Sequence, residues 1–335
     1  MRVSMKDVAR AAQVSQAAVS RVLNNNGYVS DEKRVRVLRA IEKLGYRPNA
    51  LARGLVRNQS RTIGLCLPYL NTPFISSLME GVEAESEKHG YDVFICHTKE
   101  DPGVEERAVA RMLERQVEGM LVVPVLGNRN DFATLLNAVP TLILLRKPRR
   151  ITRNLVCAND YRAAKQSLGY LLDNGHRRIG FLKGPPRVST IRERWRAISD
   201  LLKSRGIRQD PDLVAATSFD YQESYEAAMR LLAMKKRPTA IYALHYWGAA
   251  ALLKAVNDLR LRTPEDVSLV FYELFEEWNY MTNMSVASNI FPASEMGRVA
   301  VARLHGLIRR GDLFLPENVV VEQEFHAHPS VRKIR

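Results

Sequence analysis

The apolar and small residues near the start of the chain recur at helical spacing. In the segment KDVARAAQVSQAAVSRVLN, residues 6–24, they predict two short helices joined by a tight turn. Ser4 and Ser15 precede these helices as N-caps, and Asp7 follows Ser4 at the spacing of a capping box. Two such helices predict a helix-turn-helix, whose second helix enters the major groove of DNA.

A third amphipathic segment, residues 31–44, has Ser30 as its expected N-cap and Gly45 as its stop. Three of its side chains are expected to close a small core against the first two helices: Val35, Leu38 and Ile41. The basic segment that follows, residues 47–55, is too short to hold a helix alone in water. Two readings stay open for it: an ordinary linker, or a helix that forms on docking.

From residue 61 onward, short apolar runs alternate with amphipathic segments, and the alternation restarts near residue 160. The strands expected from it are 61–68, 91–98, 117–124, 141–145, 176–184, 239–244 and 267–272. Strand–helix alternation at this spacing predicts parallel sheets with right-handed crossovers. We therefore expect an α/β fold with two doubly wound parallel-sheet subdomains, and a ligand cleft off the carboxyl ends of the strands.

Positive charge is concentrated at the start of the chain. Residues 1–61 hold thirteen Lys and Arg against four Asp and Glu, a net of +9 out of +14 for all 335 residues. A scattered basic surface would also give a high pI, but concentration on one small module is typical of phosphate binding.

Several classes of protein are disfavoured. No run approaches the roughly 18–20 apolar residues of a membrane span, and no signal peptide is recognisable. Cys66, Cys96 and Cys157 lie in apolar runs without a CxxC pair, so packed free thiols in a reducing cytoplasm are expected.

Catalytic and metal motifs are also lacking. The chain has no GxxxxGK[ST], GxSxG, HExxH or GxGxxG motif, so we expect neither an enzyme nor a cofactor. His326 and His328 are spaced as neighbours on one strand face. A metal role for this pair is possible, but a solvated strand end is favoured, and no metal site is predicted.

The chain resembles the lactose/galactose repressor (LacI/GalR) family of bacterial transcription regulators over about residues 3–328. The head match consists of KDVARAAQVSQAAVSRVLN and VSDEKRVRVLRAIEKLGYRPNALARGL. The body match consists of PFISSLMEGVEAESEKHGYDVFICHT, NGHRRIGFLKGP and TPEDVSL. By resemblance, a periplasmic-binding-protein-like core follows the head and a hinge helix. The family binds pseudo-palindromic, double-stranded operator DNA as a homodimer, usually as a repressor, and a small effector changes operator affinity.

The resemblance implies a division of the chain. Residues 1–46 would form the head, 47–60 the hinge helix and linker, and 61–335 the effector-binding and dimerisation core. Within the core, one subdomain would span about 61–157 plus 288–318. The other would span about 158–287 plus 319–330.

The resemblance also implies DNA-binding residues. Gln16 and Ala17 open the helix with which the family reads base edges, and Arg21 lies one turn further along. Their chemistry suits adenine, a methyl contact and guanine respectively. Leu55 matches the leucine that the family wedges into the minor groove. The remaining expected contacts are Ser15, Ser20, Asn24, Asn49, Ala52 and Arg53.

The effector site departs from the family pattern. Arg194 matches the family's ligand-gripping arginine and Phe74 a cleft aromatic. Asn159 retains half of an Asp-Asn pair, because Ala158 replaces the aspartate. Tyr246 and Glu273 stand where the family has an Asn-Asp and a Gly-Phe/Tyr-Asp motif.

Basic residues from Arg146 to Arg153 and an aromatic cluster (Tyr246, Trp247, Tyr272) replace several sugar-binding acceptors. The basic run is more simply interpreted as a solvated loop. The cleft is either retuned for an anionic ligand or filled by its aromatics. We expect the first, with a sugar, sugar acid or sugar phosphate as effector.

The expected function is repression of a carbohydrate-related catabolic operon by a cytoplasmic dimer without membrane partners. The alternative is an activator or corepressor-dependent regulator of the same family with an altered or lost effector site. A periplasmic solute-binding protein would share the core but lack the basic head. The final PSVRKIR carries no leucine heptad for tetramerisation.

Overall fold

The structure is a computed structural model, and it describes residues 3–24, 26–46, 60–125, 136–148, 153–274, 284–310 and 317–334. The chain divides into two compact units, Met1–Arg61 and Thr62–Arg335. The segment expected as a hinge helix lies almost wholly outside the described residues.

Three helices form the first unit: α1 (Met5–Ala12), α2 (Gln16–Asn24) and α3 (Asp31–Leu44). The predicted capping box is present, because the Ser4 side chain accepts from the Asp7 N–H and the Asp7 carboxylate accepts from the Ser4 N–H. Gly45 ends α3 with a left-handed backbone, as predicted. Ser30 stands at the N-cap of α3, but its side chain makes no capping hydrogen bond.

The core of this unit differs from the sequence prediction on α3. Val37 and Ala40 are buried, whereas Val35 is 45% exposed and Leu38 53% exposed. The expectation for Val35 and Leu38 was therefore wrong. The apolar positions of α3 are ambiguous in phase, and packing against α1 and α2 selects the stripe through Val37, Ala40 and the half-buried Ile41.

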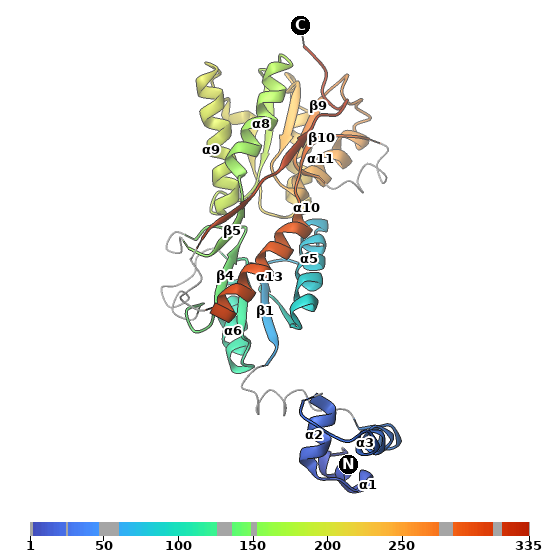
Figure 1. Cartoon of the computed structure of the whole chain (residues 1–335). Helices are drawn as coiled ribbons and strands as arrows, with labels where there is room; N and C mark the ends of the chain where they lie inside the picture. Colours follow the sequence, from blue (N-terminus) through green and yellow to red (C-terminus); the bar gives the residue numbers. More distant parts are fainter. Residues whose placement is uncertain are drawn as a thin grey trace. The chain divides into compact units, whose positions relative to one another are not determined.

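The second unit contains two six-stranded sheets (Figure 1). The first has the order β11-β5-β4-β3-β1-β2, and all its strands are parallel. Its strands are β1 (Thr62–Leu67), β2 (Asp92–His97), β3 (Gly119–Val122), β4 (Thr141–Leu144), β5 (Leu155–Ala158) and β11 (Val319–Val321). Helices α5 (Pro73–His89) and α13 (Ala293–Arg310) cover one face, and α6 (Pro102–Glu114) covers the other.

The second sheet has the order β12-β10-β9-β8-β6-β7, and only β12 is antiparallel to its neighbour. Its strands are β6 (Ile179–Lys183), β7 (Val214–Ala216), β8 (Ala240–Ala243), β9 (Ser268–Leu274), β10 (Ala287–Ile290) and β12 (Glu324–His326). Helices α8 (Asp160–Asp173) and α9 (Ser189–Ser204) pack on one face. Helices α10 (Tyr221–Leu232) and α11 (Tyr246–Asp258) pack on the other.

Helices α5 and α13, far apart in sequence, lie side by side (Figure 1). Two glycines allow the close approach: a Cβ on Gly81 would lie 1.9 Å from the Ser294 carbonyl oxygen, and one on Gly297 would lie 2.4 Å from the Leu78 carbonyl oxygen. Because the neighbours are backbone atoms, they cannot yield as a flexible side chain would. The two glycines therefore allow α13 to pack closely against α5 on the same face of the first sheet.

The predicted α/β class, with a helix-turn-helix and two parallel-dominated sheets, is confirmed. The chain crosses between the sheets three times: after β5, after β10 and after β11. Residues 288–290 pair within the second sheet and 319–321 within the first, the reverse of the division expected from the sequence. Short apolar runs do not reveal which sheet they join, because either sheet buries them equally well.

The sequence analysis did not identify β5, β7, β10, β11 or the long helix α13, and of β12 it anticipated only a strand end at His326 and His328. The three cysteines are buried free thiols, as expected. Among the described helices, none is long and apolar enough to cross a membrane. The described residues contain no group of three His, Cys, Asp or Glu side chains suited to a metal ion.

Candidate functional site

The second helix of the head presents polar side chains on a capped helix start. The Ser15 hydroxyl accepts the Ala18 N–H at 3.2 Å, so the first turn of α2 is fixed. Gln16, Ala17 and Arg21 are exposed. Behind them Val19 and Val22 are buried, which orients the exposed face away from the small core.

Arg21 packs against a glycine. Gly27 has φ +80°, and a Cβ there would lie 3.5 Å from the Arg21 Cδ. The apolar stem of Arg21 therefore lies over Gly27, which limits its rotamers and leaves the guanidinium exposed. Ser20 is half-buried, and Asn24 is the last residue of α2.

Four predicted DNA-binding residues lie outside the described residues and stay predictions: Asn49, Ala52, Arg53 and Leu55.

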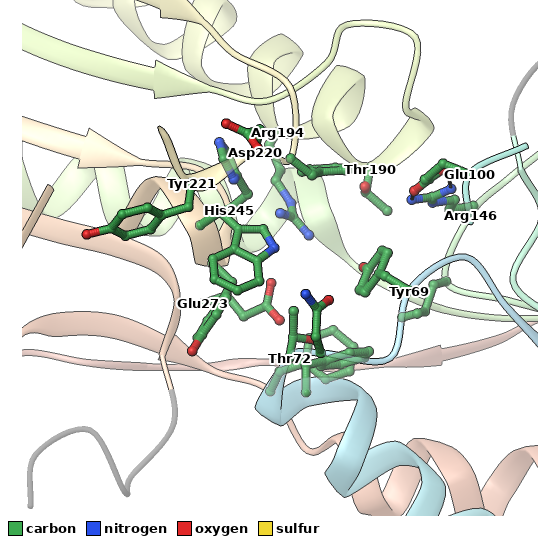
Figure 2. A pocket seen from close by; sticks show the side chains of 17 residues that line it. Tyr69, Thr72, Glu100, Arg146, Thr190, Arg194, Asp220, Tyr221, His245 and Glu273 are labelled. Carbon is green, nitrogen blue, oxygen red and sulfur yellow. Dashed lines mark hydrogen bonds and ion pairs between the residues drawn. The ribbon is translucent and has the colours of Figure 1, made fainter. Parts of the chain in front are cut away.

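The second unit contains a cavity of about 330 Å³ (Figure 2). Its walls come from loops at the carboxyl ends of strands in both sheets, the place that parallel α/β topology predicts. The lining residues are Tyr69, Asn71, Thr72, Phe74, Glu100, Leu145, Arg146, Thr190, Arg194, Phe219, Asp220, Tyr221, His245, Tyr246, Trp247, Glu273 and Phe291. The aromatics therefore line this space without filling it.

Arg146 is 3% exposed and paired at one side of the cavity (Figure 2). Its Nη1 donates to Glu100 Oε2 at 2.9 Å and to the Pro124 carbonyl oxygen at 3.1 Å, and its Nη2 donates to Glu100 Oε1. Burial would lower the pKa of Arg146, but the hydrogen bonds to Glu100 raise it. For Arg146, the expectation of a solvated basic loop was wrong, since this bidentate pair makes its burial stable.

Arg194 belongs to a second buried ion pair. Its Nε donates to Asp160 Oδ1 at 2.8 Å, and its Nη1 donates to the Leu244 carbonyl oxygen at 2.7 Å. The guanidinium stacks 3.5 Å from the Tyr272 ring centroid, and the Tyr272 hydroxyl donates to Asp160 at 2.8 Å. Burial opposes the charge of Arg194, but Asp160 raises the pKa, so Arg194 is a fixed cation.

His245 is a neutral, immobilised side chain. Its Nδ1 accepts the Gly248 N–H at 3.2 Å and caps α11, which places the proton on Nε2, 3.2 Å from the Thr217 hydroxyl. Burial, helped by the nearby Arg194, lowers the pKa of His245 to about 3. His245 therefore adds no charge to the cavity at neutral pH.

Burial shifts two further titratable groups that line the cavity. Burial raises the pKa of Tyr69 to about 12. Burial also raises the pKa of Glu273, and Arg194 only partly offsets this. The side chains of Arg194, Glu273 and Tyr69 point toward the middle of the cavity (Figure 2).

Four of the five predicted effector residues line the cavity together: Phe74, Arg194, Tyr246 and Glu273. Asn159 does not line it. Its side chain caps α8 by accepting the Arg162 N–H at 3.1 Å, and its amide donates to Glu322. The residue that engages Arg194 is Asp160, the first residue of α8. An aspartate is therefore present two positions after Ala158, although Ala158 itself replaces the aspartate of the expected Asp-Asn pair. Tyr272 stacks on Arg194 and is not among the lining residues.

Several lining residues were missed from the sequence. Tyr69 follows β1, Glu100 follows β2, Phe219 and Asp220 follow β7, and Phe291 follows β10. The rule that ligands bind at the carboxyl ends of parallel strands identifies these positions once the strand ends are known. The predictions instead followed family motif positions, which do not include these residues.

Sequence comparisons place the chain among bacterial repressors. A family model for bacterial regulatory proteins of the lacI family matches residues 4–49, and one for a periplasmic binding protein-like domain matches residues 168–327. The HTH-type transcriptional repressor PurR of Photobacterium profundum is 32% identical over 273 residues, 81% of each chain. The ribose operon repressor of Haemophilus influenzae is 29% identical over 301 residues, 90% of each chain.

Solved structures share the fold over nearly the whole length. The lac repressor dimer bound to operator and the anti-inducer ONPF has a TM-score of 0.88 at 22% identity, over 99% of this chain and 100% of that one. The complex of the transcriptional regulator CelR with cellobiose has a TM-score of 0.72 at 25% identity, over 98% of this chain and 100% of that one.

A helix-turn-helix joined to a periplasmic-binding-protein-like core defines a DNA-binding transcriptional regulator, not an enzyme. The chain belongs to the LacI family of bacterial regulatory proteins, and it is a DNA-binding transcriptional repressor of that family. The resemblance noted in the sequence is thereby confirmed.

Proposed function

We propose that the protein binds a pseudo-palindromic operator as a homodimer in the cytoplasm and represses a carbohydrate-related catabolic operon. The observation that carries the DNA part is the capped start of α2, which exposes Gln16, Ala17 and Arg21 over a buried core. Dimer binding rests on the family, in which the lac repressor is seen as a dimer on its operator. The carbohydrate link rests on relatives such as the ribose operon repressor.

The proposed division of labour follows the predicted domains. Residues 1–46 read the operator, 47–60 form a hinge that inserts Leu55 into the minor groove, and 61–335 bind effector and partner subunit. Phosphate contacts from Ser15 and Ser20 set register, while Gln16 and Arg21 read bases.

We propose that a small carbohydrate-related effector occupies the cavity and sets operator affinity. The support is the cavity of about 330 Å³, whose aromatic walls suit the apolar faces of a ring and whose Arg194 and Glu273 offer a donor and an acceptor. The argument for a sugar acid or sugar phosphate is weaker than the sequence indicated, because Arg146 and Arg194 already hold carboxylates.

The alternative to relief by a ligand is a corepressor-dependent repressor of the same family, in which the ligand is needed for operator binding. A transcription assay distinguishes the two functions. It uses a promoter that carries the operator bound by the protein, with and without a ligand that binds the cavity. Repression without ligand and relief with it support the proposal, whereas repression only with ligand supports the corepressor reading.

The first experiment is selection of binding sites from a random double-stranded DNA library at two salt concentrations. A pseudo-palindromic site whose affinity falls steeply with salt is expected for a dimeric head. Gln16→Ala should relax base preference in each half-site, while Lys165→Ala, an exposed change on α8, serves as the control. Sequence-blind binding by the full chain would reject specific operator recognition by the unliganded protein.

A further inference from the structure

The cavity contains more negative than positive charge once its ion pairs are counted. Arg146 is neutralised by Glu100, and Arg194 by Asp160. His245 is neutral for the reasons given above. An anionic ligand would therefore have to compete with carboxylates that are already bound to both guanidinium groups.

Two carboxylates of the lining remain without a cation of their own. Neither Glu273 nor Asp220 forms an ion pair within the described residues. Asp220 Oδ1 accepts the Glu223 N–H at 2.8 Å as the cap of α10, and this leaves its negative charge in place. Glu273 points into the cavity beside Arg194, whose Nε is already bonded to Asp160 (Figure 2).

Helix N-termini provide the main opposing effect. Helices α5, α9, α10 and α11 all begin at the cavity, and each N-terminus carries roughly half a positive charge. However, Thr72, Asp220 and His245 already accept backbone N–H groups of α5, α10 and α11. These three capped termini are therefore weaker anion sites than bare ones, whereas α9 begins without a side-chain cap. Its partial charge is smaller than the charge of an ionised carboxylate, so Asp220 and Glu273 outweigh it, and a bound cation would favour the charged form of Glu273.

Aromatic rings make up the rest of the wall. Tyr246 and Trp247 meet edge to face at a centroid distance of 5.0 Å, Phe74 and Phe291 at 4.9 Å, and Phe219 lies 6.2 Å from Tyr69. Aromatic faces attract organic cations, most strongly where water is excluded. Rings and carboxylates together are the recognition elements for an ammonium group.

We propose that the cavity selects a small organic cation, whose ammonium group is held by the carboxylate of Glu273 and the surrounding aromatic rings. An amino sugar satisfies both this inference and the carbohydrate-related effector, and the inference rests on the proposed function in taking the cavity as the effector site. Within the part of the chain that the structure describes, Nη2 of Arg194 donates to no protein acceptor, so it can donate to a hydroxyl oxygen of the same ligand.

The test uses matched pairs of probes that differ in charge. Binding to the full-length protein is measured by isothermal titration for glucosamine against glucose, and for choline against its carbon analogue with a tert-butyl group. Gluconate and a sugar phosphate complete the panel. We expect at least about tenfold tighter binding of the cationic member of a pair. Equal or weaker binding of both cationic members, or tighter binding of the acids, would overturn the inference.

Variants assign the preference to the carboxylate. Glu273→Gln keeps the shape of the side chain and removes its charge, so the cationic preference should fall about tenfold while the neutral member changes little. Glu114→Gln, an exposed change on α6, is the matched control. An unchanged preference in Glu273→Gln would reject the assignment even if cations bind.

Operator binding, measured in parallel without any ligand, separates this inference from the proposed function. A protein that binds a palindromic operator and responds only to neutral sugars or acids retains the proposed function and loses the inference. A protein that binds the cationic probe tightly without any effect on operator affinity retains the inference and loses the effector role of the cavity.

Discussion

The head and the cavity are built in opposite ways. The head is local: residues 4–46 hold the capping box, the turn and every described contact that orients Gln16 and Arg21. The cavity gathers residues from Tyr69 to Phe291, carried by both sheets. The geometry of the head depends on a few helix caps and small residues. The geometry of the cavity, whose residues are far apart in the sequence, depends on the packing of the whole second unit.

The difference between the head and the cavity also explains where functional residues can be assigned from a family motif. A contiguous motif carries its own geometry, so Gln16, Ala17 and Arg21 can be matched by position. In the cavity, one step along the chain moves a residue from a cap to an ion pair, as Asn159 and Asp160 show.

The largest effect should come from breaking the core's packing. Gly81→Ala places a Cβ 1.9 Å from the Ser294 carbonyl oxygen, so α13 must shift. We expect a loss of about 3 kcal/mol in the free energy of unfolding of the second unit, the upper end of the range for overpacking. Differential scanning calorimetry should show a lower core transition with the head transition unchanged, and Gly90→Asn, at an open αL position, is the control. A joint downshift of both transitions would contradict the separation of head and core.

The next largest effect concerns pH and His245. Its folded pKa of about 3 lies below the ordinary 6.5, so the unfolded chain binds an extra proton as the pH falls from 6.5 toward 3. The contribution of His245 to the free energy of unfolding is complete above pH 6.5. About 2.5 kcal/mol of this contribution is lost when the pH falls to about 4.5. His245→Asn keeps a capping acceptor without this titration, so its urea-unfolding stability should fall less steeply with acid. Parallel curves for the two proteins would refute the neutral, buried state of His245.

In the head, removal of one base-reading side chain should act on DNA alone. Arg21→Ala is expected to weaken operator binding by about 2 kcal/mol, roughly thirtyfold, through loss of a bidentate base contact. Gel-shift titration measures it, and ligand binding in the cavity should remain as in the original protein. If affinity for random DNA fell by the same factor, Arg21 would contact only phosphates.

The smallest effect should come from the capping box. Ser4→Ala removes the acceptor for the Asp7 N–H, and about 1 kcal/mol of stability should be lost from the head. Circular dichroism of the head transition follows this loss, and Ser4→Thr, which keeps the hydroxyl that accepts from the Asp7 N–H and donates to its carboxylate, should restore most of it. A change confined to the core transition would contradict the local construction of the head.

The predictability of the fold from the sequence follows the same division. Caps at Ser4 and Ser15 and the stop at Gly45 depend on neighbours within four residues, so they could be predicted. The buried stripe of α3 could not, because Val35 and Val37 are chemically alike and only tertiary packing separates them.

In the core, the alternation of strands and helices was predictable, but partner choice was not. Residues 319–321 are three valines that could complete either sheet, and their pairing with β5 is decided by long-range geometry. The cavity was predictable in place, from the carboxyl-end rule, and only partly in composition. The burial of Arg146 follows from Glu100, a residue 46 positions away that no local pattern connects to it.

The threefold crossing between the sheets has a consequence for synthesis on the ribosome. The first sheet lacks β11 and its covering helix α13 until residues beyond 293 have emerged, by which time the strands of the second sheet up to β10 have already been made. Neither sheet can be completed with its covering helices before the chain is nearly finished. Nascent chains that stall earlier therefore expose an uncovered apolar sheet face to the cell's chaperones. The head, complete by residue 46, has no such delay.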